Sequence, residues 1–361
     1  MRLSDAADDL DVEGAVRLIK EGLDLAARFE ARGLAWRPTP SDFALDDAGK
    51  LTLVERRGVF PLEYPERFNV DPLLVALGAN LVPNPLGVAP PSLVRMLLPQ
   101  KSSAKNARGV DDARKAIDAI DLKPPPATSS AAMSDAGLWR DHNDDVASTI
   151  DGGTRGNAIW HALVVCDGVS SVPHAASAAA VAARAARDEI ARSADTAEAQ
   201  HVVAFGVKAA DIAVRKLASE VDSALGTTIV CAFIRGDEVA VGWVGDSRAY
   251  LVTEDGEELL TTDHAVEREL TSCLGMVDSE GGDVSVGAEV VSRRIGREGT
   301  VVACTDGLWN YFPSASAVAH LVRNMHNTHK NAAICARFLI NSALASGGGD
   351  NVGVAVHRRG G

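Results

Sequence analysis

Three short apolar segments that follow one another along the chain constrain its fold most. They are rich in β-branched residues and lie at Thr228–Ile234, Val239–Val244 and Ala249–Thr253. The turns between them are too short to cross over a sheet, so we expect these strands to be antiparallel neighbours. Two long helical patterns precede them, at Ala175–Ser193 and Ala199–Val221, and further strands are expected at Trp160–Cys166, Val301–Cys304 and Val352–His357. The pattern predicts an α+β domain of antiparallel sheets with helices packed on their faces.

The N-terminal third of the chain has a different pattern of apolar and polar residues. A helical pattern runs from Glu13 to Arg32, and a turn at residues 46–49 joins Phe43 to Leu53 in a predicted hairpin. A segment rich in Lys, Ser and Pro follows, of a composition suited to a linker. We therefore predict an N-terminal appendage over residues 1–98, a linker over 99–132 and a main domain over 133–361.

Composition and charge narrow the functional classes. The formal net charge is -13, which disfavours general attraction to nucleic acid. Nothing approaches the apolar length of a membrane helix, and the start of the chain lacks a secretory apolar region, so we expect a cytoplasmic protein with no membrane partner. The five cysteines are odd in number and form no C-x-x-C pair, which disfavours both disulfides and structural zinc.

Aspartates recur where apolar segments end or begin. Asp167, Asp246 and Asp306 follow such segments, and Asp350 precedes one. Any single Asp-Gly pair is explained by a turn. Several carboxylates at one sheet edge would repel each other unless a cation lay among them, and oxygen ligands alone favour Mg²⁺ or Mn²⁺. Such ions support phosphoester hydrolysis, for which Arg140 could grip the phosphate.

These residues lie in a series of motifs that resembles the metal-dependent protein phosphatase 2C family, bacterial type. The series comprises residues 137–145, 165–168 and 226–228, then Gly245-Asp246-Ser247-Arg248-Ala249, Leu260-Thr261-Thr262-Asp263-His264, Thr305-Asp306-Gly307-Leu308-Trp309 and Gly349-Asp350-Asn351. The resemblance spans about Ser134 to Arg358. It implies two antiparallel sheets in a sandwich flanked by helices, with residues 133–361 as the catalytic domain and a small N-terminal α/β appendage.

The resemblance also implies a role for each matching residue. Asp167 would bridge two Mg²⁺ or Mn²⁺ ions, and Gly168 would contribute its carbonyl oxygen. The other implied metal ligands are Asp306 and Asp350 for the first ion, Asp144 for the second, and Asp246 with Asp306 for a weaker third ion. Asp145 would hold metal-bound water, and Arg140 would grip the phosphate. The implied activity is serine/threonine phosphoprotein phosphatase chemistry in signalling, by direct attack of a metal-bridging water, with an opposing protein kinase as a further partner.

The sequence departs from the family pattern after the first metal aspartate. Val169 stands where many relatives have a general-acid histidine, which leaves metal-bound water or one of the histidines to protonate the leaving group, namely His142, His161 or His174. Asn310 replaces an aspartate that some relatives use for the third ion, and the segment 263–274 is short for the family's flap. A catalytically weak or inactive phosphoprotein-binding scaffold is therefore the alternative function.

The N-terminal segment has a fainter similarity of its own. The order of helix, prolines and the hairpin at residues 43–51 is similar to the middle of a protein-kinase C-lobe. It lacks the His-Arg-Asp and Asp-Phe-Gly motifs, so such a remnant could bind or regulate but could not transfer phosphate. An unrelated small helical and β appendage is the other interpretation.

Overall fold

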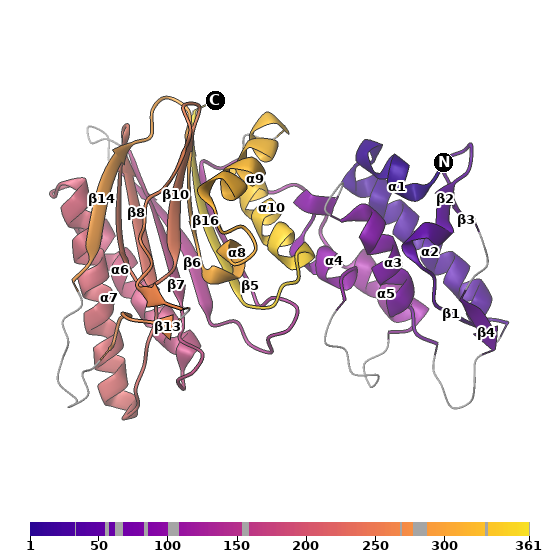
Figure 1. Ribbon diagram of the computed structural model, residues 1–361, viewed down its shortest axis with the longest axis horizontal. Helices are drawn as coiled ribbons and strands as arrows, with labels where there is room; N and C mark the ends of the chain where they lie inside the picture. Colours follow the sequence, from indigo (N-terminus) through magenta and orange to yellow (C-terminus); the bar gives the residue numbers. More distant parts are fainter. Residues whose placement is uncertain are drawn as a thin grey trace. The chain divides into compact units, whose positions relative to one another are not determined.

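The chain folds into two compact units. The computed structural model (Figure 1) describes residues 1–32, 34–54, 58–61, 68–82, 86–99, 108–153, 159–267, 269–276, 287–328 and 331–360. Unit 1 comprises Met1–Pro124 with Leu344–Gly347, and unit 2 comprises Pro125–Ala343 with Gly348–Gly361. No described helix has the length and apolar character needed to cross a membrane.

Unit 1 is a helical core with short two-stranded sheets. Its elements are α1 (Leu3–Ala6), η1 (Ala7–Asp9), α2 (Val12–Glu30), β1 (Leu34–Trp36), η2 (Pro40–Asp42), β2 (Phe43–Leu45), β3 (Leu51–Leu53), β4 (Val59–Pro61), α3 (Asp71–Leu81), η3 (Leu86–Val88), α4 (Pro91–Met96) and α5 (Val110–Asp118). Helix α2 begins where the Asp11 carboxylate accepts a hydrogen bond from the Gly14 N–H at 2.7 Å. The predicted helix and hairpin are both present, and Gly49 supplies the positive φ of 72° that the hairpin turn requires. The kinase-like interpretation of this segment stays a prediction.

The predicted linker over residues 99–132 contains regular structure at both of its described ends. Helix α5 lies inside it and buries Val110, Ala113 and Ile117 in the core of unit 1. Strand β5 (Ser130–Asp135) begins before its end, and unit 2 begins at Pro125. The polar surface of α5 concealed its apolar face, whereas residues 100–107 lie outside the described residues. The linker prediction was therefore too long.

Unit 2 is a sandwich of two five-stranded sheets, which confirms the predicted fold class. The first sheet has the order β14-β9-β8-β7-β6, with β6 (Asp145–Gly152), β7 (Trp160–Asp167), β8 (Ile229–Arg235), β9 (Glu238–Val244) and β14 (Glu289–Arg294). The second has the order β11-β10-β15-β16-β5, with β10 (Arg248–Thr253), β11 (Glu257–Leu259), β15 (Gly299–Cys304) and β16 (Val352–Arg359). All pairings are antiparallel, and β12 (Ala265–Val266) with β13 (Glu269–Leu270) forms a small separate hairpin.

Helices cover the outer faces of the sandwich. Helices α6 (Ala175–Ser193) and α7 (Ala199–Val221) have the predicted bounds and pack on the first sheet, as Figure 1 shows. Small residues such as Ala178, Ala182 and Ala186 form the buried face of α6 and let the helix lie close to the sheet. The other helices of the unit are α8 (Asp306–Trp309), α9 (Ala315–Thr328), which packs against β10 and β11, and α10 (Ala332–Ala345). A second apolar cluster, with Leu163 and Val301 among its members, fills the space between the sheets.

The three consecutive strands do not all pair as expected. Strands β8 and β9 are antiparallel neighbours, but β10 belongs to the other sheet. The chain changes sheets at Gly245, whose φ is +105° and whose missing Cβ would lie 2.6 Å from Thr228 Cγ2. Glycine permits this turn because a larger residue would be strained in conformation and would collide with β8. Asp246 lies at the crossing between the sheets.

Candidate metal centre

Antiparallel topology gathers the aspartates at one end of the sandwich. Strands β7 and β15 end there, and β6 and β16 begin there, so residues far apart in sequence meet at one edge. Asp145 and Asp167 are direct cross-strand partners in the register of β6 and β7. The charges of Asp145, Asp306, Asp246 and Asp350 all raise the pKa of Asp167, which places the five carboxylates within electrostatic reach of each other.

Burial makes these carboxylates hard to ionise without a cation. Asp145 is 5% exposed, and burial raises its pKa to about 8, with further contributions from Asp306 and Asp350. Burial raises the pKa of Asp167 well above its usual range. The pKa of Asp306 is raised to about 6, by burial first and then by the charges of Asp350 and Asp246. A divalent cation among these carboxylates would relieve the repulsion between their charges.

A buried threonine positions Asp145. The Thr305 hydroxyl donates to Asp145 Oδ2 at 2.7 Å and accepts from the Gly353 N–H at 2.8 Å. This hydrogen bond lowers the pKa of Asp145 and offsets part of the effect of burial. Thr305 therefore links β16 to the carboxylate that begins β6. In the sequence, the one signal for this role of Thr305 is its position directly before Asp306.

Asn351 is a second residue whose role the sequence analysis missed. Its side-chain amide donates to the carbonyls of Ala136 at 3.0 Å and His142 at 2.7 Å, and its Oδ1 accepts from the Asp144 N–H at 2.8 Å. It is 5% exposed. Three hydrogen bonds from one buried side chain fix the loop that carries Arg140 and Asp144. In the sequence, the signal for this role is the position of Asn351 directly after Asp350.

Hydroxyls from the two residues directly before β8, and from Ser247 at the sheet crossing, hold the end of β7. The Thr228 Oγ1 accepts from the Asp167 N–H at 3.1 Å and lies 2.7 Å from Ser247 Oγ. The Thr227 hydroxyl donates to the Asp167 carbonyl at 2.8 Å. Both threonines are buried. The backbone of Asp167 is therefore fixed from two sides, which orients its carboxylate toward the cluster.

Asp144 and Gly168 lie side by side at the same edge. The Gly168 N–H donates to the Asp144 carbonyl at 3.2 Å. A Cβ at Gly168 would lie 2.4 Å from the Ala175 carbonyl oxygen, so only glycine allows α6 to begin this close to β7. Asp144 was predicted to hold the second ion and Gly168 to contribute its carbonyl oxygen, and the structure places both next to Asp145 and Asp167.

Asp350 and Arg140 form an ion pair at the mouth of the site. The Arg140 guanidinium donates to Asp350 Oδ2 at 2.7 Å, and both side chains are partly exposed. The charge of Arg140 also lowers the pKa of Asp306. Asn310 donates to Asp306 Oδ2 at 3.1 Å, so the residue that replaces a family aspartate serves as a hydrogen-bond donor. The predicted phosphate-binding arginine thus lies beside the predicted metal ligands.

Asp246 lies near Arg248, which several contacts hold in place. Burial first and then the charge of Asp263 raise the pKa of Asp246, and Arg248 counteracts them. Arg248 binds both carboxylate oxygens of Asp263, at 2.7 Å through Nη2 and 2.9 Å through Nε, and its guanidinium lies 3.8 Å from the centre of the Trp309 ring. It also donates to the Pro313 carbonyl at 2.9 Å. Arg248 therefore ties the start of β10 to the segment that carries Asp306.

The three candidate proton donors separate in the structure. His161 lies near the start of β7, six residues and about 20 Å of strand from Asp167, and binds Asp151 instead. His142 is exposed in the loop held by Asn351, and His174 is exposed directly before α6. His161 is thus too remote to act on the predicted substrate. Val169, in the position of the family histidine, donates its backbone N–H to the Gly226 carbonyl at 2.9 Å.

The chemistry of the cluster fits hard divalent cations. It offers carboxylate oxygens with mutually raised pKa values, and burial keeps the neighbouring Cys166 and Cys304 thiols protonated, a set that favours Mg²⁺ or Mn²⁺ over zinc. In this structure Asp145 is turned toward Thr305 and Asp350 toward Arg140. Within the described ranges, no group of three or more His, Cys, Asp or Glu side chains is arranged to hold one ion as it stands. Binding would require these carboxylates to rotate toward each other.

Comparisons with known proteins identify relatives of this part of the chain. Residues 132–297 match the protein phosphatase 2C family. The serine/threonine phosphatase stp of Listeria innocua is 29% identical over 157 residues, which are 39% of this chain and 60% of that protein. The Listeria monocytogenes protein of the same name is 28% identical over the same length. The matched part of this chain therefore spans less than two thirds of these curated relatives.

Solved structures show the same fold. Stp1 from Staphylococcus aureus has a TM-score of 0.52 at 21% identity, over 64% of this chain and 95% of that one. The catalytic domain of the phosphatase PstP, solved with two manganese ions, has a TM-score of 0.50 at 24% identity, over 64% of this chain and 97% of that one. Unit 2 thus has the fold of these phosphatases, and the match of residues 132–297 to the protein phosphatase 2C family agrees with the resemblance drawn from its motifs.

Proposed function

We propose that this chain is a metal-dependent serine/threonine phosphoprotein phosphatase. The observation that carries the proposal is the convergence of Asp145, Asp167, Asp306 and Asp350 at one edge of the sandwich, with Arg140 at its mouth. The protein phosphatase 2C family and the two manganese ions of PstP support it. The substrate class is a protein phosphorylated on serine or threonine, which an opposing protein kinase must supply.

The residues of the site would have three roles: metal ligands, a carboxylate that orients water, and an arginine that binds phosphate. Asp167, Asp306 and Asp350 would hold one cation, and Asp144, Asp167 and the Gly168 carbonyl would hold the other. Mg²⁺ or Mn²⁺ in these places supplies the Lewis acidity that makes water a nucleophile near neutral pH and neutralises the phosphoryl oxygens. Asp246 with Asp306 would hold a weaker third cation.

The chain's own groups would then position the reactants. Arg140 would exchange Asp350 for two phosphate oxygens, because a guanidinium matches that geometry. Asp145, fixed by Thr305, would accept a hydrogen bond from the attacking water and hold it in line with the ester bond. The bond from phosphorus to the serine or threonine oxygen breaks as the bond to the water oxygen forms. A proton reaches the departing oxygen from solvent or from exposed His142 or His174.

A hydrolysis assay tests this proposal. We expect Mn²⁺-dependent hydrolysis of p-nitrophenyl phosphate and of a phosphothreonine peptide. Asp306→Asn should reduce the rate by a factor of about 100 or more, because it removes a ligand charge. The matched control is Asp255→Asn, an exposed turn residue outside the cluster. Equal rates for Asp306→Asn and the parent chain would refute the proposal.

The alternative function is a phosphoprotein-binding scaffold without turnover. The packing of Val169 against Gly226, in place of a general-acid histidine, is the observation that favours it. The same assay decides between the two functions. If the parent chain and Asp306→Asn are equally inert while a phosphothreonine peptide still binds through Arg140, the scaffold is the correct function.

A further inference from the structure

Strand β3 of unit 1 presents an open edge. Its inner edge pairs with β2, as the Asp46 N–H donates to the Lys50 carbonyl at 3.0 Å and the Val54 N–H to the Asp42 carbonyl at 2.9 Å. In this antiparallel register the backbone groups of Leu51 and Leu53 point away from β2. The sheet has two strands within the described residues, so no described strand pairs with that outer edge.

The two edges of this hairpin differ. The N-terminal residues close the outer edge of β2, because Leu45 donates to the Met1 carbonyl at 2.8 Å and accepts from the Met1 amino group at 3.2 Å. On β3, the Leu51 N–H donates to Glu21 Oε2 at 2.7 Å. The Leu51 carbonyl and both backbone groups of Leu53 make no hydrogen bond with any residue in the described ranges. Such open edges are templates for another strand.

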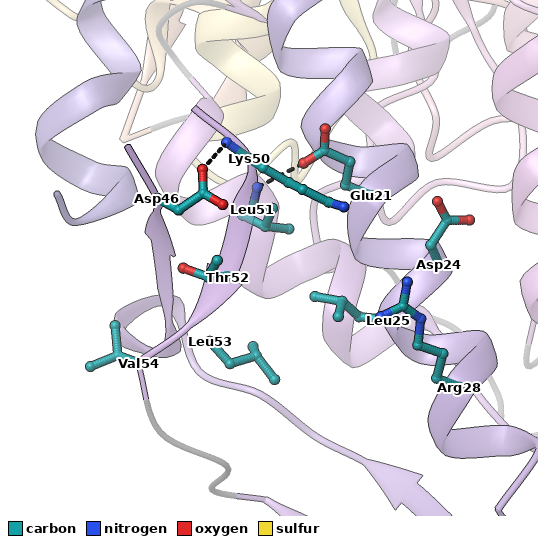
Figure 2. A pocket seen from close by; sticks show the side chains of 10 residues that line it. All are labelled: Glu21, Asp24, Leu25, Arg28, Asp46, Lys50, Leu51, Thr52, Leu53 and Val54. Atoms are coloured by element: carbon teal, nitrogen blue, oxygen red, sulfur yellow. Dashed lines mark hydrogen bonds between the residues drawn. The ribbon is translucent and has the colours of Figure 1, made fainter. Parts of the chain in front are cut away.

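A cavity of about 570 Å³ runs along this edge. Figure 2 shows its two walls, which are one face of α2 and the strand residues of β3. The lining residues on α2 recur at helical spacing, and those on the strand side are consecutive, so the cavity follows the strand. The lining residues are Glu21, Asp24, Leu25 and Arg28 from α2, Asp46 from the turn, and Lys50–Val54 from β3 and the residues flanking it. Its volume lies in the range of ligand-binding pockets.

The acidic side chains that line the cavity accept hydrogen bonds, whereas its two basic side chains form no ion pair with a described residue. Asp24 binds Arg114 at 2.7 Å, and the Asp46 carboxylate accepts from the Ala48 and Lys50 N–H groups, each at 2.9 Å. Arg28 and Lys50 form no ion pair with a described residue. Figure 2 shows the Lys50 side chain extending along the cavity toward α2. Glu21 and Asp24 are paired with Arg17 and Arg114, so Arg28 and Lys50 against Asp46 leave an excess of one positive charge at the lining.

We propose that this cavity binds an extended acidic segment of a partner protein, which adds to β3 as a third strand. Its backbone would pair with the Leu51 carbonyl and with both backbone groups of Leu53, as in other cases of strand addition. Its carboxylates, at alternate positions, would reach Lys50 and Arg28, and apolar side chains between them would lie against Leu25 and Leu53. Unsatisfied backbone groups at strand spacing favour a peptide over a compact small molecule. The site belongs to unit 1 and does not depend on the function proposed for unit 2.

Peptide binding to the full-length chain tests the proposal. The probe is a fluorescein-labelled decapeptide of alternating Glu and Val, measured by fluorescence anisotropy against the same peptide with Lys in place of Glu. A third peptide carries N-methyl groups on one edge of its backbone. We expect binding of the Glu peptide only, with at least tenfold weaker binding of the other two. Binding of all three alike, or of none, would overturn the proposal.

Two variants separate the backbone and charge contributions. Leu53→Pro removes the outward N–H while leaving the β2 ladder intact, because proline is tolerated at an edge facing away from the partner strand. Arg28→Glu with Lys50→Glu reverses the uncommitted charges, and Lys115→Glu with Lys123→Glu is the matched control on exposed residues outside the cavity. We expect at least a tenfold loss of affinity in the first two and none in the control. Parent-like affinity in Leu53→Pro and in the charge reversal, with unfolding temperatures unchanged, would show that the edge is not used.

Discussion

The Arg140 guanidinium donates to Asp350 Oδ2 at 2.7 Å, across 210 positions of sequence. This pair joins the loop before β6 to the start of β16, and it places a phosphate-binding group beside a metal ligand. We expect Arg140→Ala to raise KM for p-nitrophenyl phosphate and the inhibition constant of inorganic phosphate by about 10- to 100-fold, the range of a charge-assisted bidentate contact. Steady-state kinetics with phosphate as inhibitor check this. Unchanged phosphate inhibition would place Arg140 outside the substrate site.

Asp167 contributes to both implied ions, so its loss should differ from that of a peripheral acid. We expect Asp167→Ala to abolish Mn²⁺ binding together with turnover, because the bridging charge is lost. Calorimetric titration of Mn²⁺ measures the stoichiometry, and Asp255→Asn provides the control. Parent-like stoichiometry in Asp167→Ala would contradict the assignment of this residue as a metal ligand.

Metal affinity should depend on pH through the raised carboxyl pKa values. The pKa of Asp145 is about 8 and that of Asp306 about 6, against 3.8 in the unfolded chain. The folded protein retains protons that the unfolded chain releases, so the ion-free protein should lose stability as pH rises from about 4 to 8. Mn²⁺ affinity should increase over the upper part of that range, because ligands must lose their protons.

Calorimetry in two buffers of different ionisation enthalpy measures the protons that each bound ion releases. We expect net release at pH 7 and little at pH 9. Asp145→Asn should reduce the release because it removes the carboxyl group with the higher pKa. Affinity that is constant between pH 6 and 8, with no proton release, would contradict the raised pKa values.

A buried histidine at the other end of the sandwich should make unit 2 sensitive to acid. Burial and then the charge of His161 lower the pKa of His357 from 6.5 to about 4. The charge of Arg359 lowers this pKa further, and that of Asp151 raises it. Its ring lies 4.5 Å from that of His161, and its Nδ1 lies 2.9 Å from Ser130 Oγ. The unfolded chain protonates below pH 6.5 while the folded ring stays neutral. Stability should therefore fall between pH 6.5 and 4, by on the order of 3 kcal/mol from this residue.

Urea unfolding at pH 7.5 and pH 5 measures this loss. We expect His357→Gln to flatten the pH dependence, and the exposed His320→Gln to leave it as in the parent chain. Equal slopes in the two variants would show that another group carries the acid sensitivity.

Arg248 should not be replaceable by lysine. A lysine would lose the bidentate contact with Asp263 and the planar stacking on Trp309. We expect Arg248→Lys to lower kcat/KM by about tenfold through displacement of Asp246 and Asp306, the magnitude of one lost charge-assisted contact. Arg323→Lys, which alters an exposed pair with Glu257, is the control for steady-state kinetics. Equal activity of both variants would mean that Arg248 has no positioning role.

Sequence reasoning worked best where one physical signal acts alone. The bounds of α6 and α7 follow from alanine-rich helical periodicity, and four of the five main carboxylates follow from the ends of apolar segments, whereas Asp145 follows from the family resemblance. Sequence reasoning failed where a feature depends on contacts between residues far apart in the sequence or is hidden by a polar surface. The move of β10 to the second sheet depends on a glycine conformation, and α5 is short and polar on its exposed side. Thr305 and Asn351 act through hydrogen bonds to residues far along the chain, which no local pattern predicts.

Strand β5 pairs with β16, so the first strand of unit 2 needs a neighbour that lies more than two hundred residues later. Until β16 is synthesised, β5 has no partner in its sheet, and β15 has an open side where β16 belongs. Long-range pairing of this kind slows folding and exposes strand edges meanwhile. A ribosome stalled before residue 352 would therefore hold a nascent chain with two unpaired strand edges, and premature termination there should yield aggregates rather than a folded unit 2.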